Sequence, residues 1–299
     1  MTSGPTDDSV GPWAREKLDA LGRYLDFYTK VLKNQGHWCK GTIYVDAFAG
    51  GGRARIRRPG GDADIDQLIE ALADSADRED EEYLRGSPRV ALDVANRFSR
   101  YVFIERNPQR AAELELLRDE YGSSYNIEVR RGAADQELDA LLRGELGRRD
   151  YRSVVFLDPF GMQLSWSIIE RLAATKTVEV FINFALGMAI QRLLVRSAEI
   201  PPGWKDTLDR FFGTSDWFGQ VYESTDDLFG ARTRKAADSG TRLLNWYRSR
   251  LKAAFGHVSP ARLVRNTKGG HLYYLIWAGP HATGLKGADH ILSKGEIVR

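Results

Sequence analysis

Acidic residues follow three short apolar runs of the chain, and they are the side chains best placed to do chemistry. Asp46 follows "TIYV", Glu105 follows "YVFI" and Asp158 follows "VVFL". Each run is typical of a buried strand that ends in a loop. In an open α/β sheet, ligands bind outside the carboxyl ends of the strands. The three carboxylates therefore predict a site for a ligand that offers amino or hydroxyl donors.

The first of these loops is rich in glycine. Asp46, Ala47, Phe48 and Ala49 lead into Gly50, Gly51 and Gly52, and a basic stretch follows with Arg53 and Arg55. Glycines at such a place let a ligand approach the main chain and tolerate positive φ. A purely structural turn explains the glycines equally well. The arginines predict binding of a phosphate backbone. The alternative is that they belong to a solvated loop.

The second and third loops suggest how a nucleoside would be held. An acid such as Glu105 after the second strand can accept hydrogen bonds from ribose hydroxyls. The separation from Gly52 is longer than the ~20 residues of the dinucleotide fingerprint, and an insertion at 59–85 accounts for most of the excess. The third strand ends in small residues with an acid at the rim, which leave room for a flat ring: Gly132, Ala133, Ala134 and Asp135.

The fourth loop carries the sharpest pattern, "LDPFG" at 157–161. Asp158 can accept from an amino group, Pro159 fixes the turn, and the ring of Phe160 can stack on a planar base. The alternative is an Asp-Pro turn with Phe160 in the core. Trp166 is predicted to complete a sandwich around an extruded base, and Asn183, at the end of the fifth strand, is a further polar contact.

The elements that position these residues alternate between strand and helix. Short apolar stretches at 43–45, 101–105, 125–134, 151–161 and 178–185 are separated by amphipathic stretches. This alternation predicts parallel βαβ units and a doubly wound, mostly parallel Rossmann-like sheet with helices on both faces. A glycine turn inside 261–279 predicts a C-terminal antiparallel hairpin.

The remaining segments define the domain organisation. Residues 1–12 are predicted to be a flexible tail and 13–33 an amphipathic helix. Ser87 and Pro88 have the residue types of a helix N-cap and first turn. The main domain spans 13–187 and 257–299, with 59–85 as an inserted loop. The aromatic-rich stretch 188–256 is predicted to be a mainly helical insertion on the substrate side.

Composition narrows the class of protein. The chain has 299 residues, a net charge of +2, one cysteine and five histidines. A single cysteine excludes a disulfide framework and a multi-cysteine metal site, and the histidines lack a metal-ligand spacing. We expect no metal, because the sequence offers no ligand set for one. We also expect no membrane span and no signal peptide, which favours a cytoplasmic protein.

Taken together, "VDAFAGGG", "FIERN", "GAAD" and "LDPFG" resemble the successive sites of a class I S-adenosylmethionine-dependent methyltransferase. More narrowly, the chain resembles the bacterial three-Cys-motif partner protein family. The stretches that carry this likeness run from about residue 13 to 290, and they include "KLDALGRYLDFYTKVL", "GSPRVAL", "FINF" and "YYLIWAGPHATGLK".

This resemblance implies a seven-stranded methyltransferase fold and S-adenosylmethionine as the cofactor. It places the methionine end at Asp46 and the glycine loop, the ribose at Glu105, and Asp158 beside the transferred methyl. Lys17, on the helix before the first strand, is expected to touch cofactor or substrate. The full set of implied cofactor contacts is Lys17, Asp46, Phe48, Ala49, Gly50, Gly51, Gly52, Glu105, Arg106, Ala133, Ala134, Asp135 and Asp158.

The predicted function is methylation of a base in DNA or RNA, with Asp158, Pro159 and Phe160 as the catalytic motif. Enzymes that methylate base amino groups typically carry Asp/Asn-Pro-Pro-Tyr/Phe, whereas this chain has Asp-Pro-Phe-Gly. This difference from the usual motif bears on the identity of the methyl acceptor more than on that of the cofactor. Two alternatives stay open: a methyltransferase for a small molecule or a protein, and a non-catalytic cofactor-binding partner of another enzyme. The family name also implies a protein partner encoded nearby.

Overall fold

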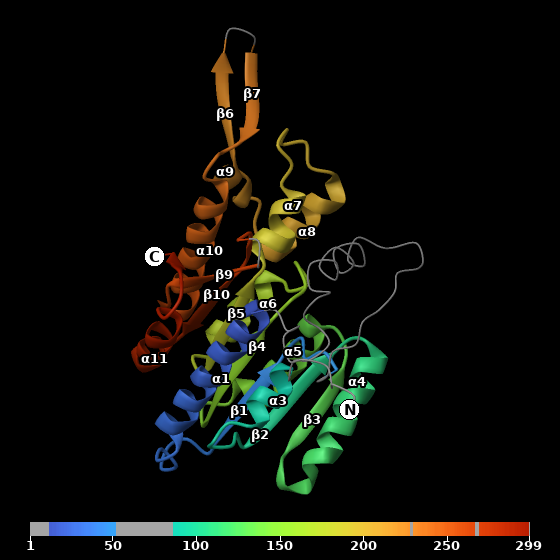
Figure 1. Ribbon diagram of the computed structural model, residues 1–299, viewed down its shortest axis with the longest axis vertical. Coiled ribbons are helices and arrows are strands. Elements are labelled where there is room, and N and C mark those ends of the chain that lie inside the picture. The colour runs from blue at the N-terminus through green and yellow to red at the C-terminus, as the bar shows by residue number, and fades with distance from the viewer. Residues whose placement is uncertain (1–11, 52–85, 228–229, 267–268, 299) are drawn as a thin grey trace, which may run out of the picture.

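A computed structural model describes residues 12–51, 86–227, 230–266 and 269–298. Figure 1 shows a central sheet flanked by helices, with one β-hairpin standing away from the body. The helices of the first half are α1 (Pro12–Leu32), α3 (Ser87–Leu92), α4 (Pro108–Tyr121), α5 (Ala134–Arg143) and α6 (Trp166–Ala174). Its strands are β1 (Gly41–Asp46), β2 (Arg100–Glu105), β3 (Ile127–Arg131), β4 (Tyr151–Leu157) and β5 (Val178–Phe184).

The second half supplies the remaining helices and strands. Its helical elements are the π-helical turn η3 (Leu186–Ile190), α7 (Gln191–Leu193), α8 (Pro202–Phe212), α9 (Trp217–Val221), α10 (Ser239–Phe255) and α11 (Ala282–Leu292). Its strands are β6 (Tyr222–Asp227), β7 (Gly230–Lys235), β8 (His257–Val258), β9 (Ala261–Arg265), β10 (His271–Gly279) and β11 (Ile297–Val298). Short 3₁₀ turns, η1 (Gly122–Ser124) and η2 (Glu145–Gly147), follow α4 and α5.

The order of the strands confirms the predicted fold class. The sheet runs β11-β9-β10-β5-β4-β1-β2-β3, and β8 pairs with β10, so the described sheet has nine strands where seven were expected, with the two-residue strands β8 and β11 as the additions. Strands β3, β2, β1, β4 and β5 are parallel neighbours, whereas β10 is antiparallel to both β5 and β9. The strand order reverses between β1 and β4, so the switch point of this doubly wound sheet lies there. The predicted C-terminal hairpin is β9 and β10.

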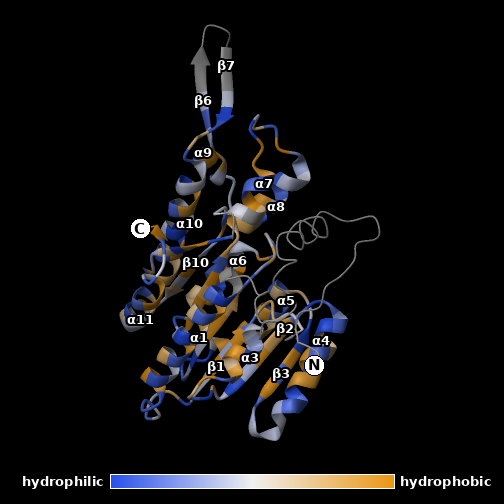
Figure 2. Cartoon of the chain, viewed as in Figure 1, coloured by the Kyte–Doolittle hydropathy of each residue, from blue (hydrophilic) through white to orange (hydrophobic). Residues whose placement is uncertain are grey.

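Both faces of the sheet are covered by helices, and alternation along each strand divides the core in two. On β1, Ile43 and Val45 face the cluster that includes α5, α6 and α10, whereas Tyr44 faces the cluster of α1, α3, α4 and α11. Figure 2 shows hydrophobic residues gathered on the central strands and polar residues on the outer helix surfaces. Period-two alternation in a buried parallel sheet produces this division.

The segment 188–256 differs from its predicted form in two ways. It contains the β-hairpin β6–β7 in addition to helices, and the hairpin was not foreseen because "YESTDD" has no apolar alternation. Several of its aromatic rings also pack into the core. Tyr247 stacks on Phe184 with ring centroids 4.5 Å apart, and both side chains are buried. The rings therefore mainly anchor the insertion to the sheet.

Candidate functional site

Asp158 is the centre of a polar cluster at the carboxyl edge of the sheet. The Lys17 Nζ of α1 lies 2.7 Å from its Oδ2, and the Asn183 amide nitrogen donates to its Oδ1. The register that pairs Leu157 with Ile182 brings the two following residues together. The Lys17 and Asp158 side chains are 17% and 19% exposed, so the ion pair is open to a ligand. Lys17 also lies 5.4 Å from the ring centre of Tyr273 on β10.

An unused acceptor completes this cluster. The Asn183 Oδ1 is buried and accepts no hydrogen bond from the described residues. A buried acceptor without a donor destabilises the fold by about 1–3 kcal/mol. A ligand amine held by Asp158 would have an N–H to offer to this oxygen. The structure therefore brings together Lys17, Asp158 and Asn183, which the sequence had placed on three separate elements.

Asp46 lies at the end of the neighbouring strand and is fully buried. The pKa of Asp46 is raised to about 7, because burial and the nearby charge of Asp158 raise it more than the hydrogen bonds from Ser87, the Phe48 N–H and Tyr44 lower it. The Phe48 N–H lies 3.2 Å from Oδ1 and the Tyr44 hydroxyl 3.3 Å from Oδ2. No lysine or arginine among the described residues pairs with it. Asp46 thus fixes the start of the glycine loop from beneath.

The glycine loop is covered at its base and open at its tip. Ala47 and Ala49 are buried, and their N–H groups donate to the carbonyls of Phe156 and Ile104 at 3.0 Å. Gly50 has a φ of +62°, and a Cβ built there would meet nothing within 4 Å. A left-handed residue facing open space is where glycine gives a ligand access to the main chain. Gly52, Arg53 and Arg55 lie outside the described residues.

Glu105 ends β2 and is only 5% exposed. Its Oε1 accepts from the Asn107 N–H at 2.7 Å and from the Arg110 guanidinium at 3.1 Å. Both of these donors use the same oxygen. Arg110 in turn lies 6.0 Å from the ring centre of Phe160. The ring of Phe160 therefore stands on the side of Glu105, near the position predicted for a ribose. Arg106 is exposed beside it.

Two predicted contacts have other partners in the structure. Asp135 accepts from the Ser165 N–H with both oxygens, at 3.1 and 3.2 Å, so its carboxylate ties α5 to the loop after β4. Trp166 is 3% exposed and packs edge-on against Tyr247, while its indole N–H donates to Glu170. Trp166 therefore has a packing role, in place of the predicted contact with a base. Of the other residues after β3 and β4, Ala134 and Pro159 are buried and Ala133 is half-buried.

Sequence reasoning missed three contributors to the site. Ser87 was expected to cap α3, but Gly86 occupies the N-cap position and the Ser87 hydroxyl bonds Asp46 instead. Nothing in the sequence connects residues so far apart. Tyr44 was detectable, because a residue two positions before Asp46 on a strand shares its face. Arg110 was also detectable, since it lies in the first turn of the helix after Glu105.

The described residues contain no cluster of three or more potential metal ligands. Within the same residues, no helix combines the length and the apolar character of a membrane span. An open glycine turn, a buried acid at the end of β2 and the Lys17–Asp158–Asn183 cluster fit a ligand with a sugar, a charged amino acid part and a nearby amine acceptor.

Comparisons with known proteins give no family assignment. No protein-family model and no curated protein matches the chain. Among solved structures, protein LPL1258 of Legionella pneumophila is 12% identical, with a TM-score of 0.43 over 92% of this chain and 90% of that one. Magnesium protoporphyrin IX methyltransferase of Synechocystis, solved with bound S-adenosylhomocysteine, is 11% identical, with a TM-score of 0.30 over 93% and 90% of the two chains.

A further likeness is to protein PH0226 of Pyrococcus horikoshii, which is 7% identical with a TM-score of 0.29 over 91% of this chain and 93% of that one. At such identities these likenesses concern the path of the chain and not its chemistry.

Proposed function

We propose that the chain is an S-adenosylmethionine-dependent methyltransferase that acts on an exocyclic amine of a nucleic-acid base. The observation that carries the proposal is the Asp158 cluster at the switch point, with Lys17 and Asn183 as its partners. Ligands of doubly wound sheets bind in the crevice at that point. The sequence resemblance to methyltransferases, and more narrowly to the three-Cys-motif partner family, agrees with this placement but depends on motifs alone.

The cofactor would lie across the carboxyl ends of β1, β2 and β4. Glu105 would accept from the ribose hydroxyls, and Phe160 would line the same side with Arg110. The open tip at Gly50 would admit the methionine part to the main chain. Asp46 is buried, so we assign it a positioning role beneath the loop, together with an electrostatic one. Its negative charge would favour a cationic ligand above it.

S-adenosylmethionine, when bound, would supply a methyl group on a positively charged sulfur; transfer would leave a neutral thioether, and the acceptor nitrogen would release one proton to solvent to become neutral again. The chain must hold the acceptor in line and about 3–3.5 Å away. Asp158 would accept one amine hydrogen and Asn183 Oδ1 the other. This pair keeps the nitrogen lone pair free to point at the methyl group. Lys17 fixes the Asp158 carboxylate in this orientation.

Nucleic acid is favoured as the acceptor by the Asp-Pro-Phe sequence after β4 and by the basic stretch that contains Arg53 and Arg55. The corrected place of Trp166 leaves Phe160, whose ring lies toward Arg110 and Glu105, as the remaining ring of the predicted sandwich. We expect an extruded base to stack on an aromatic ring on one side only. Taking the base out of its stack in the nucleic acid costs a few kcal/mol. The protein partner implied by the family resemblance stays a prediction.

Calorimetry with S-adenosylmethionine, followed by incubation with methyl-labelled cofactor and DNA, RNA or cell lysate, tests the proposal. We expect saturable cofactor binding, and we expect label in nucleic acid. Labelling of nucleic acid should be strongest at low salt, because phosphate contacts weaken as salt rises. Label in protein or in a small molecule would overturn the nucleic-acid acceptor. Absence of cofactor binding would overturn the whole proposal.

A further inference from the structure

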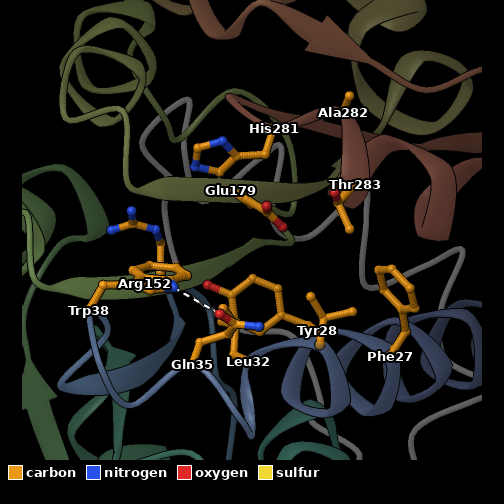
Figure 3. A pocket seen from close by; sticks show the side chains of 12 residues that line it. Phe27, Tyr28, Leu32, Gln35, Trp38, Arg152, Glu179, His281, Ala282 and Thr283 are labelled. Carbon is orange, nitrogen blue, oxygen red and sulfur yellow. Dashed lines mark hydrogen bonds between the residues drawn. The ribbon is translucent and has the colours of Figure 1, made fainter.

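A cavity of about 510 Å³ lies at the opposite, amino edge of the sheet. Figure 3 shows Glu179 projecting from the sheet and Tyr28 and Phe27 from α1 toward it, with His281 on the far side. Glu179 is the second residue of β5 and Arg152 the second of β4, so both lie where the parallel strands begin. The volume is within the range of small-molecule sites. The cofactor site proposed above lies where the same strands end.

The wall of this cavity is mostly apolar and reaches the surface through exposed hydrophobic side chains. Phe27, Leu32 and the ring of Tyr28 line it, and Val31 and Trp38 are each 39% exposed. Large apolar side chains left in water beside a cavity are typical of a binding site. The Trp38 indole is held in place by Arg152, whose guanidinium lies 4.5 Å from the ring centre, and by Gln35, which accepts its N–H at 2.8 Å.

Polar groups without protein partners converge inside this apolar wall. The Tyr28 hydroxyl and the Arg152 Nε are buried, and neither has a hydrogen-bond partner among the described residues. Glu179 is 5% exposed, and its Oε2 accepts from the Tyr24 hydroxyl. A hydrogen bond with the Trp277 side chain also lowers the pKa of Glu179. Each unmet group destabilises the fold by about 1–3 kcal/mol, which a bound ligand would offset.

The charges of the cavity indicate a neutral ligand. Above about pH 7, the value to which its pKa is raised chiefly by burial, Glu179 is ionised and is balanced by Arg152, whose charge acts on it directly. Desolvation, Arg152 and His257 lower the pKa of His281, so this ring adds little positive charge near neutral pH. A cation would meet Arg152, and an anion would meet Glu179. The cavity offers an acceptor, Glu179, and a donor, the Tyr28 hydroxyl, with the flat ring of Trp38 at its mouth. These groups match a planar molecule that carries one donor and one acceptor.

We propose that this cavity binds a neutral planar heterocycle in which an N–H group stands beside a carbonyl, as in uracil and guanine. The N–H would donate to Glu179, the carbonyl would accept from the Tyr28 hydroxyl, and the ring would stack near Trp38. The proposal does not depend on the proposed methyltransferase function, because the two sites lie at opposite edges of the sheet.

Calorimetric titration of the full chain with uridine and guanosine tests this, each paired with an analogue methylated on the ring nitrogen, 3-methyluridine and 1-methylguanosine. We expect saturable binding of one or both nucleosides, and binding of the matching methylated analogue about tenfold weaker, because it lacks the N–H. Saturating S-adenosylhomocysteine should leave the nucleoside affinity unchanged. Competition by S-adenosylhomocysteine would place the nucleoside at the other edge and overturn the proposal.

Protein variants provide the second arm of the test. Glu179→Gln and Tyr28→Phe each keep the shape of the side chain, and each should weaken nucleoside binding about tenfold. Leu116→Ala, at an exposed position of α4, is the matched control and should bind as the unaltered chain does. Tyr28→Phe preserves the packing of α1, so it tests the contact even if Glu179→Gln perturbs folding. Equal affinity in both variants, equal binding of the methylated analogues, or no binding of either nucleoside would overturn the proposal.

Discussion

Asp46 and Glu179 are buried carboxyl groups at opposite ends of the same sheet, and burial raises the pKa of each to about 7. Their immediate partners are also alike, since a tyrosine hydroxyl donates to each: Tyr44 to Asp46 and Tyr24 to Glu179. The two carboxyl groups differ in the residues that lie beyond these direct partners. A raised pKa therefore reports burial at both ends and does not by itself indicate which ligand fits.

The neighbours decide the chemistry. Near Asp46 stand a second carboxylate, Asp158, with its own lysine, and an open glycine turn, so the carboxyl edge suits a cationic ligand with many donors. Near Glu179 stand aromatic rings and the balancing Arg152, so the amino edge suits a neutral planar one. Helix α1 contributes to both edges through Lys17 and Tyr28, about 16 Å apart along a helix that rises 1.5 Å per residue.

The largest expected effect is on stability. Each carboxyl binds its proton more tightly in the folded chain than in the unfolded one, where the pKa is 3.8 for Asp46 and 4.5 for Glu179. The free energy of unfolding should therefore fall as the pH rises from 5 to 8, by about 2–3 kcal/mol for each group. Urea unfolding at several pH values measures this fall.

Glu179→Gln should remove about half of the pH dependence of the unfolding free energy, and Asp46→Asn should remove the other half. Comparison of the two variants shows whether burial raises the pKa equally at the two edges. Asp119→Asn, on an exposed side chain, is the control. A Glu179→Gln profile parallel to that of the unaltered chain would contradict the raised pKa of Glu179.

The second effect separates the two edges by activity. Asp158→Ala should reduce methyl transfer about 100-fold, because the acceptor loses the group that orients it, while cofactor affinity changes less than about threefold. Transfer of labelled methyl groups at saturating cofactor measures the loss. Asp119→Ala is the matched control. Activity within about threefold of the unaltered chain would remove Asp158 from the reaction.

The third effect concerns cofactor binding alone. Glu105→Gln should weaken S-adenosylmethionine binding about tenfold, since a hydrogen bond to a charged group is lost. The rate at saturating cofactor should stay nearly unchanged. Glu115→Gln, which alters a surface ion pair with Arg131, is the control in the same calorimetric titration. An unchanged affinity would mean that Glu105 only holds Arg110.

The smallest effect is a pH dependence of cofactor affinity. Because Asp46 must ionise to attract a cation, affinity should rise several-fold, and at most about tenfold, between pH 6 and 7.5. Asp46→Asn should flatten this rise. Calorimetry at the two pH values provides the comparison. A flat profile in the unaltered chain would show that the charge of Asp46 is not felt by the ligand.

The sequence by itself determined the sheet and the edge at which we propose that the ligand binds. The stretches 43–46, 101–105 and 151–158 each end in a carboxylate, and parallel strands bring such ends to one edge. The placement of Asp158 beside Asn183 follows from the same reasoning, because neighbouring parallel strands align their ends. Local periodicity and strand direction suffice for these conclusions.

Only the tertiary structure decided which side chains meet. Ser87 bonds Asp46, Asp135 bonds the Ser165 N–H, and Trp166 enters the core against Tyr247, although the sequence suggested a helix cap, the rim of a site for a flat ring and a base sandwich. The cavity around Glu179 likewise forms from α1, β4, β5 and α11. Contacts between residues distant in sequence depend on packing, and no local pattern records that packing.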